Sequence, residues 1–224
     1  MAALEPIIRE KTLGATAYDK LKRALMTGAF EQGTRLTVRG IADSLDISIT
    51  PARDALSRLI AEGALEAKGP KTVIVPPLSF PALREITRIR LALEGMAAEV
   101  ATPNIDGQKL QLLEATQEKL NEAMEERRYR DVLSANEMFH FTIYRAANMP
   151  RLLAIIESQW LRIGPSLILL YPEFAISKRG ISNHNRTLDG LRSGEPSVVR
   201  EAIEQDLRDG FDRLRRMVES QSAS

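Results

Sequence analysis

Apolar residues recur at helical spacing through most of the chain after residue 81. Steps of three and four residues place such side chains on one face of a helix. The runs are Leu83, Ile86, Leu93, Ala97 and Val100; Val132, Phe139, Ile143 and Ala147; Ile181, Leu188 and Leu191; and Ile203, Leu207, Phe211, Leu214 and Val218. Turn-forming residues separate helical segments at 102–104, 148–150, 164–165 and 193–196. We therefore expect an all-α bundle of about six helices over residues 79–224.

Residues 1–78 have a different pattern. Short helical runs are broken by turn signals, and the β-branched triplet Val73–Val75 follows a Gly-Pro turn at 69–70. The pair Pro76-Pro77 comes directly after the triplet, and proline ends a strand because it has no N–H to donate. We expect a separate N-terminal domain over residues 1–78 that is helical and contains a short strand.

Composition limits the possible partners. The chain of 224 residues carries 31 Lys and Arg against 30 Asp and Glu, so its overall charge does not favour a polyanionic partner. The chain has no cysteine, which excludes disulfides and thiolate metal sites. Apolar runs such as 167–171 are far shorter than the roughly 20 residues that cross a bilayer, and the N-terminus lacks a signal peptide. We expect a cytoplasmic protein without a membrane partner.

The stretch 37–59 has the pattern of a helix-turn-helix. Thr37 and Ser48 are good helix caps, and a tight turn separates the two short helices that they begin. The second helix would present Ser48, Thr50 and Arg53 outward, where one helical face can enter a major groove. A basic turn follows before the strand, with Gly69 and Lys71, and it could lie on phosphates as a wing.

The alternative for this segment is a small helical domain whose arginines are only solvated. Residues 1–78 contain eleven Lys and Arg against nine Asp and Glu, which is a weak positive charge. A DNA-binding protein of this kind would need a dimer to double its phosphate contacts.

Polar side chains interrupt the apolar faces of three helices in the second part. Asn136 and His140 lie one turn apart within one stripe, His184 lies within another, and Asp206 borders a third. Imidazole with oxygen donors is a ligand set that a divalent transition metal accepts. The alternative is a core without metal, in which His140 is hydrogen-bonded to Asp206 or to a backbone carbonyl.

Arg90 occupies a position where the helical pattern calls for an apolar residue. A buried guanidinium needs an anion. Glu94, one turn later, could supply it internally. Alternatively, Arg90 with Arg162 and Tyr171 could meet the carboxylate of an organic-acid effector that also reaches the metal.

Residues 35–79, RLTVRGIADSLDISITPARDALSRLIAEGALEAKGPKTVIVPPLS, resemble the winged helix-turn-helix of the GntR family of bacterial transcription regulators. The helical remainder is similar to the FadR-type effector domain of that family, the FCD domain. The resemblance implies a mainly α fold with a small β-wing. It also implies a regulator, commonly a repressor, that binds a palindromic operator as a homodimer and responds to a small carboxylate.

The resemblance assigns roles to individual residues of the N-terminal part. Arg35 and Arg53 match DNA-contacting arginines, Ser48 and Thr50 match small hydroxyl residues at the start of the recognition helix, Gly69 matches the wing tip, and Thr37 would bond a phosphate. Ile49 departs from the pattern, because the family usually has arginine there. Isoleucine can touch a thymine methyl but cannot donate to guanine, so we expect an operator that depends less on a G at that step.

The resemblance also implies a metal site. Asn136, His140, His184 and Asp206 fall on the ligand positions of the FadR-type domain, with Asn136 in place of a more usual aspartate and Asp206 in place of a histidine. Zinc, nickel or manganese are the expected ions. The effector would lie nearby, at Arg90, Glu94, Arg162 and Tyr171.

A metal-dependent hydrolase of all-α fold is the alternative function. Such an enzyme needs a general base beside the metal-bound water, and no HExxH spacing supplies one. The sequence also lacks GxSxG, a phosphate-binding glycine loop and a cysteine nucleophile. We therefore expect a regulator and not an enzyme.

Overall fold

The N-terminal helices begin at hydroxyl caps. In a computed structural model, which describes residues 12–69, 71–171, 173–174 and 179–222, Thr12 accepts the N–H of Ala15 and begins α1 (Leu13–Met26). Thr37 likewise accepts the N–H of Gly40 and begins α2 (Val38–Leu45). The left-handed backbone of Asp46, with φ of 52°, turns the chain into α3 (Ile49–Ala61). The helix-turn-helix expected at 37–59 is therefore present.

A small antiparallel sheet completes the winged module. Its strands β1 (Arg35–Thr37), β2 (Glu66–Gly69) and β3 (Thr72–Ile74) lie in the order β1-β3-β2, with Leu36 opposite Val73. The strand predicted at 73–75 begins one residue earlier than expected. All residues of β2 are exposed, so β2 has no alternating pattern, and only its pairing with β3 defines it.

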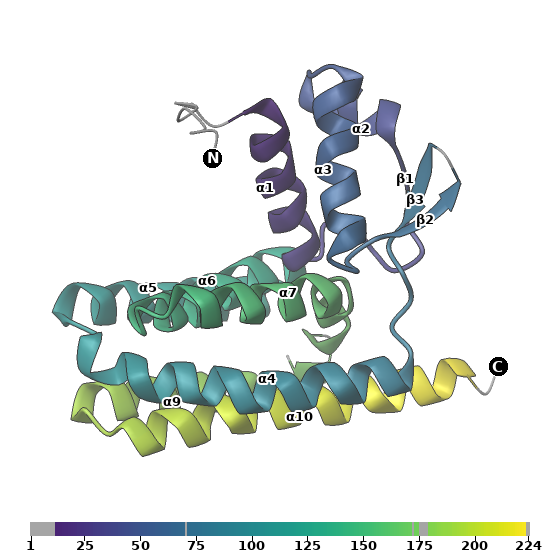
Figure 1. Ribbon diagram of the computed structural model, residues 1–224. Coiled ribbons are helices and arrows are strands. Elements are labelled where there is room, and N and C mark those ends of the chain that lie inside the picture. The colour runs from purple at the N-terminus through teal and green to yellow at the C-terminus, as the bar shows by residue number, and fades with distance from the viewer. Residues whose placement is uncertain (1–11, 70, 172, 175–178, 223–224) are drawn as a thin grey trace, which may run out of the picture.

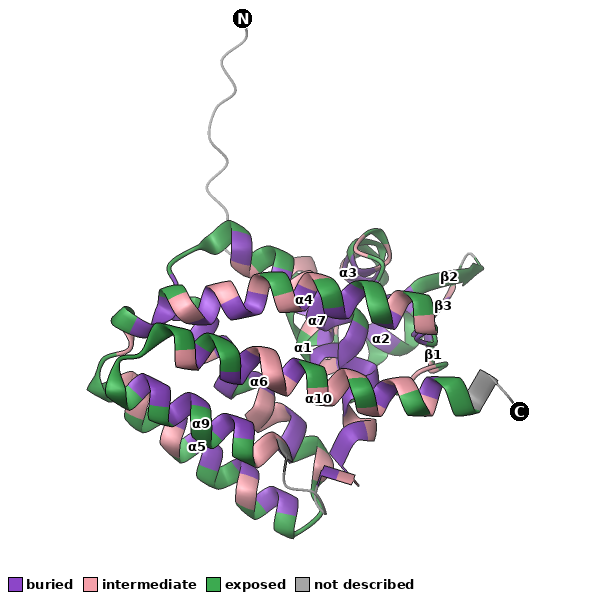
Figure 2. Cartoon of the chain, turned by 90° about the horizontal axis from the view of Figure 1, so that it is seen from below, coloured by how far each residue is buried: buried purple, intermediate pink, exposed green. Residues whose placement is uncertain are grey.

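The second part of the chain is a helical bundle, and six α-helices are described in it. They are α4 (Phe80–Ala101), α5 (Gly107–Glu125), α6 (Tyr129–Ala146), α7 (Pro150–Leu167), α9 (Arg179–Ser193) and α10 (Pro196–Ser222), with short 3-10 helices η1 (Thr102–Asn104) and η2 (Ile168–Leu170). The long helices α4 and α10 lie side by side, and α5 lies along α6 (Figure 1). Buried residues face the inside of the bundle and exposed residues face outward (Figure 2). The predicted fold class, a winged helix-turn-helix followed by an all-α bundle, is confirmed.

The loop expected at 164–165 is absent, because both residues lie inside α7. Here α7 passes directly against the backbone at the end of α1. A Cβ on Gly164 would lie 2.6 Å from the carbonyl oxygen of Leu25 and 2.8 Å from the Cα of Met26. The glycine therefore serves a close helix approach and not a turn, and tertiary packing keeps Pro165 within the helix.

Among the residues that the structure describes, one helical segment is long and apolar enough to cross a membrane. This is Pro150–Leu170, with mean hydropathy of 1.3 over its most apolar window. Within the structure 56% of that window is buried, and the side chains of Trp160 and Ile163 are fully enclosed by the bundle. Packing in the bundle therefore accounts for the apolar character of α7.

The close approach at Gly164 makes a prediction about stability. Gly164→Ala should lower the free energy of unfolding by about 1–3 kcal/mol, because the added methyl group would press on backbone atoms that cannot turn away. Urea denaturation followed by circular dichroism measures this loss. Gly107→Ala is the control, since nothing lies within 4 Å of its Cβ position. Equal stability of the two variants would contradict the argument.

Candidate metal centre and nucleic-acid interface

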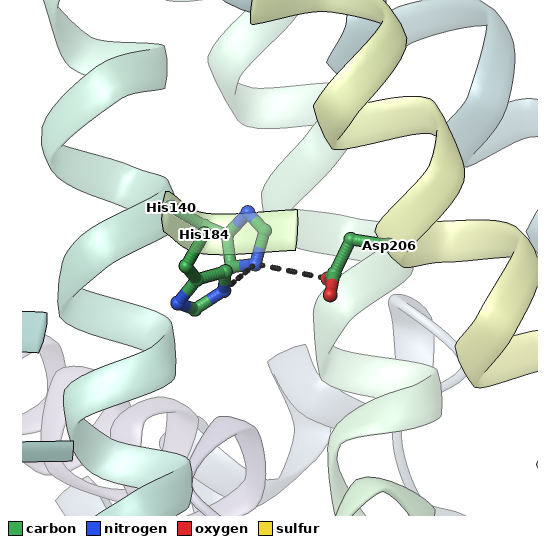
Figure 3. A group of neighbouring side chains, drawn as sticks. All are labelled: His140, His184 and Asp206. Atoms are coloured by element: carbon green, nitrogen blue, oxygen red, sulfur yellow. Dashed lines mark hydrogen bonds and ion pairs between the residues drawn. The ribbon is translucent and has the colours of Figure 1, made fainter. Parts of the chain in front are cut away.

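Three side chains from three helices meet inside the bundle: His140 from α6, His184 from α9 and Asp206 from α10 (Figure 3). The Nε2 atoms of the two histidines lie 3.3 Å apart, and Nε2 of His140 lies 3.4 Å from Oδ2 of Asp206. Both imidazoles are buried, and the carboxylate is nearly so. The ligand atoms that these residues can offer lie within 4.8 Å of one another.

The hydrogen bond of His184 decides which of its nitrogens carries the proton. Its Nδ1 lies 2.6 Å from Oε1 of Gln117, an atom that can only accept. The amide of Gln117 is oriented in turn, because its Nε2 donates to Oδ1 of Asn121 at 2.8 Å. Nδ1 of His184 therefore carries the proton, and Nε2 turns a lone pair toward His140.

A longer chain of hydrogen bonds likewise decides which nitrogen of His140 carries the proton. Its Nδ1 lies 3.0 Å from the hydroxyl of Tyr144, and that hydroxyl donates to Oε2 of Glu94 at 2.7 Å. Burial, together with the charge of Glu94, raises the pKa of Tyr144, so the phenol keeps its proton. The phenol oxygen is then free only to accept from Nδ1 of His140. Nε2 of His140 therefore also carries a lone pair.

Two lone pairs and a carboxylate oxygen thus face one another, and a cation bound between them would offset their mutual repulsion. Bonds of about 2.1 Å to a shared divalent ion place two of its ligand atoms about 3.0–3.4 Å apart. The separations of 3.3 and 3.4 Å have that size. In the alternative arrangement no metal is bound, and Nε2 of His140 carries a second proton that it donates to Asp206. The three residues fit a divalent metal ion.

The environment keeps these ligands in the protonation states that metal binding requires. Burial lowers the pKa of His184 to about 3, against the opposing effect of Asp206, so its ring is neutral near pH 7. Burial raises the pKa of Asp206, but the neighbouring side chains of His140, His184 and Arg90 lower it by more. The result is a neutral imidazole beside an ionised carboxylate.

Asn136 is the fourth residue of the expected ligand set. It is half-buried, lies one turn before His140 on α6 and lines the same cavity. Its side chain makes no hydrogen bond with any residue in the part of the chain that the structure describes. An amide oxygen is therefore available beside the metal centre.

The metal centre forms the polar end of a cavity of about 40 Å³. The guanidinium of Arg90 and the ring of Tyr171 also line it. The remaining walls are mainly apolar and include Leu120, Met124, Ile163, Leu167, Leu170, Phe174, Ile181, Leu207, Phe211 and Leu214. A polar end with apolar walls suits a small ligand that has one charged group.

The sequence left two partners open for Arg90, Glu94 or the carboxylate of an effector. The structure shows the pair with Glu94. Nε and Nη2 of Arg90 donate to the two oxygens of Glu94 at 2.6 and 3.2 Å. Trp160 donates its Nε1 to Oε1 of Glu94 at 3.0 Å. Burial lowers the pKa of Arg90, but Glu94 raises it by more, so the guanidinium stays charged. Glu94 is fully enclosed and does not line the cavity, so it is placed to orient Arg90 and not to touch a ligand.

The expectation that Arg162 lies in the cavity is wrong. Trp160 and Ile163 face the cavity from α7, and a residue two positions from Trp160 points away from that side of the helix. Arg162 is exposed, and its Nε lies 3.8 Å from the Cβ position of Gly63 in the winged module.

Sequence reasoning missed Gln117 and Tyr144, which orient the two histidines, and Trp160, which donates a hydrogen bond to Glu94. A signal existed for two of them. Gln117 lies in the buried stripe of α5 with Leu113 and Leu120, and Tyr144 follows His140 by one turn. A buried amide or phenol in an apolar stripe needs a partner, as the histidines do.

The expected DNA-reading residues lie on the surface of the winged module. Ser48 precedes α3 and makes no capping bond, Ile49 is 40% exposed, and Thr50 and Arg53 are exposed on the first turns of the helix. In Figure 1 this end of α3 lies beside α2 and away from the bundle. Helix termini and side chains in this position can reach a groove.

The basic residues of this surface differ in how far they are neutralised. Arg35, Arg53 and Lys71 are exposed and form no ion pair with any residue that the structure describes. Lys68, by contrast, pairs with Glu66 at 2.7 Å. Gly69 is exposed at the end of β2, with nothing within 4 Å of its Cβ position. Unpaired cations and an open strand end are suited to contact phosphates.

Two family models together cover most of the chain. The model of bacterial regulatory proteins of the gntR family matches residues 13–75, and the FCD domain model matches residues 85–223. The HTH-type transcriptional regulator McbR of Escherichia coli (strain K12) is 35% identical over 198 residues, which cover 88% of this chain and 90% of that protein. The gluconate operon transcriptional repressor of Bacillus subtilis (strain 168) is 25% identical over 225 residues, covering 92% and 87%.

Solved structures agree with this assignment. The structure of E. coli McbR/YncC superposes with a TM-score of 0.83 at 32% identity and covers 94% of this chain and 99% of that one. A GntR regulator from Rhodococcus sp. RHA1, at 18% identity, shares the fold with a TM-score of 0.72 over 90% and 96% of the two chains. These relatives are regulators, and none of them supports the hydrolase alternative. The chain therefore belongs to the GntR family, with an FCD domain behind its helix-turn-helix, and is a DNA-binding transcriptional regulator and not an enzyme.

Proposed function

We propose that this regulator is a cytoplasmic, homodimeric repressor whose hold on a palindromic operator is controlled by a small organic acid bound beside a metal ion. Residues 1–78 form the DNA-binding domain and residues 79–224 the effector and dimerisation domain. One observation carries the sensing half of this proposal. Two unprotonated imidazole nitrogens and the carboxylate of Asp206 converge at the polar end of a cavity that Arg90 also lines.

The residues that hold the ion are His140, His184 and Asp206, with Asn136 as the fourth donor. Two imidazoles with one carboxylate and one amide favour zinc, nickel or manganese over magnesium or calcium, which prefer oxygen ligands alone. When bound, the ion supplies a Lewis-acidic position to which a carboxylate can attach. The Nδ1 atoms of the two histidines donate to Gln117 and Tyr144, and these hydrogen bonds keep both rings turned toward the ion.

The charges around the cavity explain why an acid is the expected effector. Arg90 is positive, whereas Glu94 and Asp206 are negative, so these side chains together carry one net negative charge. A divalent ion changes the sign and leaves one net positive charge. The cavity then attracts a monoanion, and Arg90 is placed to donate to it. Burial raises the pKa of Tyr171, so its phenol keeps a proton that it can donate as well.

The DNA-reading role belongs to the exposed residues around α3 and the wing. The base edges of the major groove would be faced by Ser48, Ile49, Thr50 and Arg53. The DNA backbone and the minor groove would be approached by Arg35, Thr37, Gly69 and Lys71. A single module offers few unpaired cations. Two modules in a dimer double the phosphate contacts and read the two halves of a palindrome.

Loss of one arginine should remove operator binding. Arg53→Ala is expected to weaken binding by at least about 30-fold, because each half-site loses a contact worth about 1–3 kcal/mol and a dimer has two of them. An electrophoretic mobility shift with the duplex that the unaltered chain selects from a random pool measures this. Arg186→Ala on the exposed side of α9 is the control and should bind normally. Normal binding by Arg53→Ala would contradict the proposal that α3 reads the operator.

The isoleucine at the start of α3 should set one base preference. Ile49→Arg is expected to introduce a preference for G at the step that residue 49 faces, because arginine donates to guanine O6 and N7 and isoleucine does not. Selection sequencing of both proteins compares the two preferences. An unchanged preference would show that residue 49 does not reach a base.

Metal binding should depend on Asp206 and not on its neighbour on the helix. Asp206→Asn and His140→Ala are expected to lose the ion that the purified chain retains, as measured by elemental analysis, while leaving operator binding intact. Asp209→Asn is the matched control, because Asp209 bonds Asn183 and Gln205 outside the metal centre.

The same variants test sensing. With a panel of small carboxylates, His140→Ala and chelator-treated protein should show a blunted release from the operator. If both still respond like the unaltered protein, the metal centre has no part in sensing.

A further inference from the structure

The helix that walls the cavity also carries the winged module. Trp160, Ile163 and Leu167 of α7 line the cavity, and Trp160 is hydrogen-bonded to Glu94 beside Arg90. Other side chains of the same helix, Glu157 and Ser166, contact the winged module. A ligand that displaced α7 would therefore change the cavity wall and move the contacts with the winged module at the same time, because both belong to one helix.

Two polar contacts join α7 to the winged module. Nζ of Lys22 on α1 lies 2.5 Å from Oε2 of Glu157, and both side chains are mostly buried, at 20% and 24% exposed. Gln32 donates through Nε2 to the hydroxyl of Ser166 at 2.8 Å. Its Oε1 accepts the N–H of Leu78, just before α4, at 2.9 Å. One amide thus ties the winged module both to α7 and to the segment that leads into the bundle.

These polar contacts surround a backbone contact. Gly164 of α7 lies against the end of α1, and a Cβ on Gly28 would lie 2.8 Å from Leu133 of α6. The joint therefore combines close backbone approach with a few polar side-chain pairs. Apolar side chains are buried at the joint as well, because one core cluster includes Leu25 and Met26 of α1 together with Leu133 and Leu167 of the bundle.

We propose that Lys22, Gln32, Glu157 and Ser166 are positioning residues for operator recognition, which hold the winged module against α7 and so set where α3 stands. This inference rests on the proposed dimer, in which the distance between two α3 helices must match the distance between two half-sites. None of the four residues belongs to the metal centre or to the DNA-reading surface. They act on DNA only through the placement of α3.

Charge reversal separates this role from a general effect of charge on DNA binding. Lys22→Glu and Glu157→Lys change the net charge in opposite directions, yet each places like charges together in a partly buried pair. Each should therefore weaken binding to the selected duplex at least about fivefold, the lower end of typical coupling between sites. The double variant Lys22→Glu/Glu157→Lys restores an opposite pair and should bind within about twofold of the unaltered protein.

The control is an exposed pair on the far side of the bundle, Arg186 and Glu201, whose atoms lie 2.7 Å apart. Arg186→Glu and Glu201→Lys make the same changes in net charge without touching the joint. Circular dichroism and elution volume establish that all variants are folded and of unchanged size, and the rescued double variant excludes simple misfolding.

The result that overturns the inference is binding that follows net charge alone, weaker for Lys22→Glu and tighter for Glu157→Lys, as in the control pair. Unchanged binding in both single variants overturns it equally. Failure of the proposed function looks different, because the unaltered chain would then retain no particular duplex from the pool.

Discussion

The carboxylate of Glu94 is the interaction on which the interior of the bundle depends. It is completely enclosed, and it accepts hydrogen bonds from Arg90, Tyr144 and Trp160, which come from α4, α6 and α7. A buried carboxylate without such partners would cost several kcal/mol, so these helices are held in one arrangement about it. Through Tyr144 the same group fixes the proton on His140. A structural requirement of the core thereby orients one of the three candidate metal ligands.

This arrangement joins electrostatics to recognition. The internal pair with Glu94 keeps Arg90 in place without turning it away from the cavity, and a divalent cation bound at Asp206 would leave the cavity with a net positive charge. Trp160 extends the network into α7, the helix that meets α1. Packed and hydrogen-bonded side chains therefore connect the cavity in the bundle to the winged module.

Several errors of sequence-based prediction have a common origin. The pair at 164–165 has the composition of a turn, yet it lies in a helix, and the close approach of α1 explains why residue 164 is a glycine. Arg162 has the chemistry of an effector ligand but points toward the winged module. The strand β2 has no pattern of its own. In each case contacts with a distant segment overrode local composition.

Periodicity and capping in the sequence by themselves determined the fold class, the helix-turn-helix and the inward positions of His140 and His184, because these depend on neighbours within a few residues. The motif of the first domain further determined the family. The family resemblance implied that His140, His184 and Asp206 meet, and spacing left Glu94 as one of two partners for Arg90. Only the tertiary structure decided that these three side chains do come together, that Glu94 satisfies Arg90, and that α7 links the cavity to the winged module. Some of these contacts join residues more than a hundred positions apart. The periodicity of a single sequence does not show how separate helices pack.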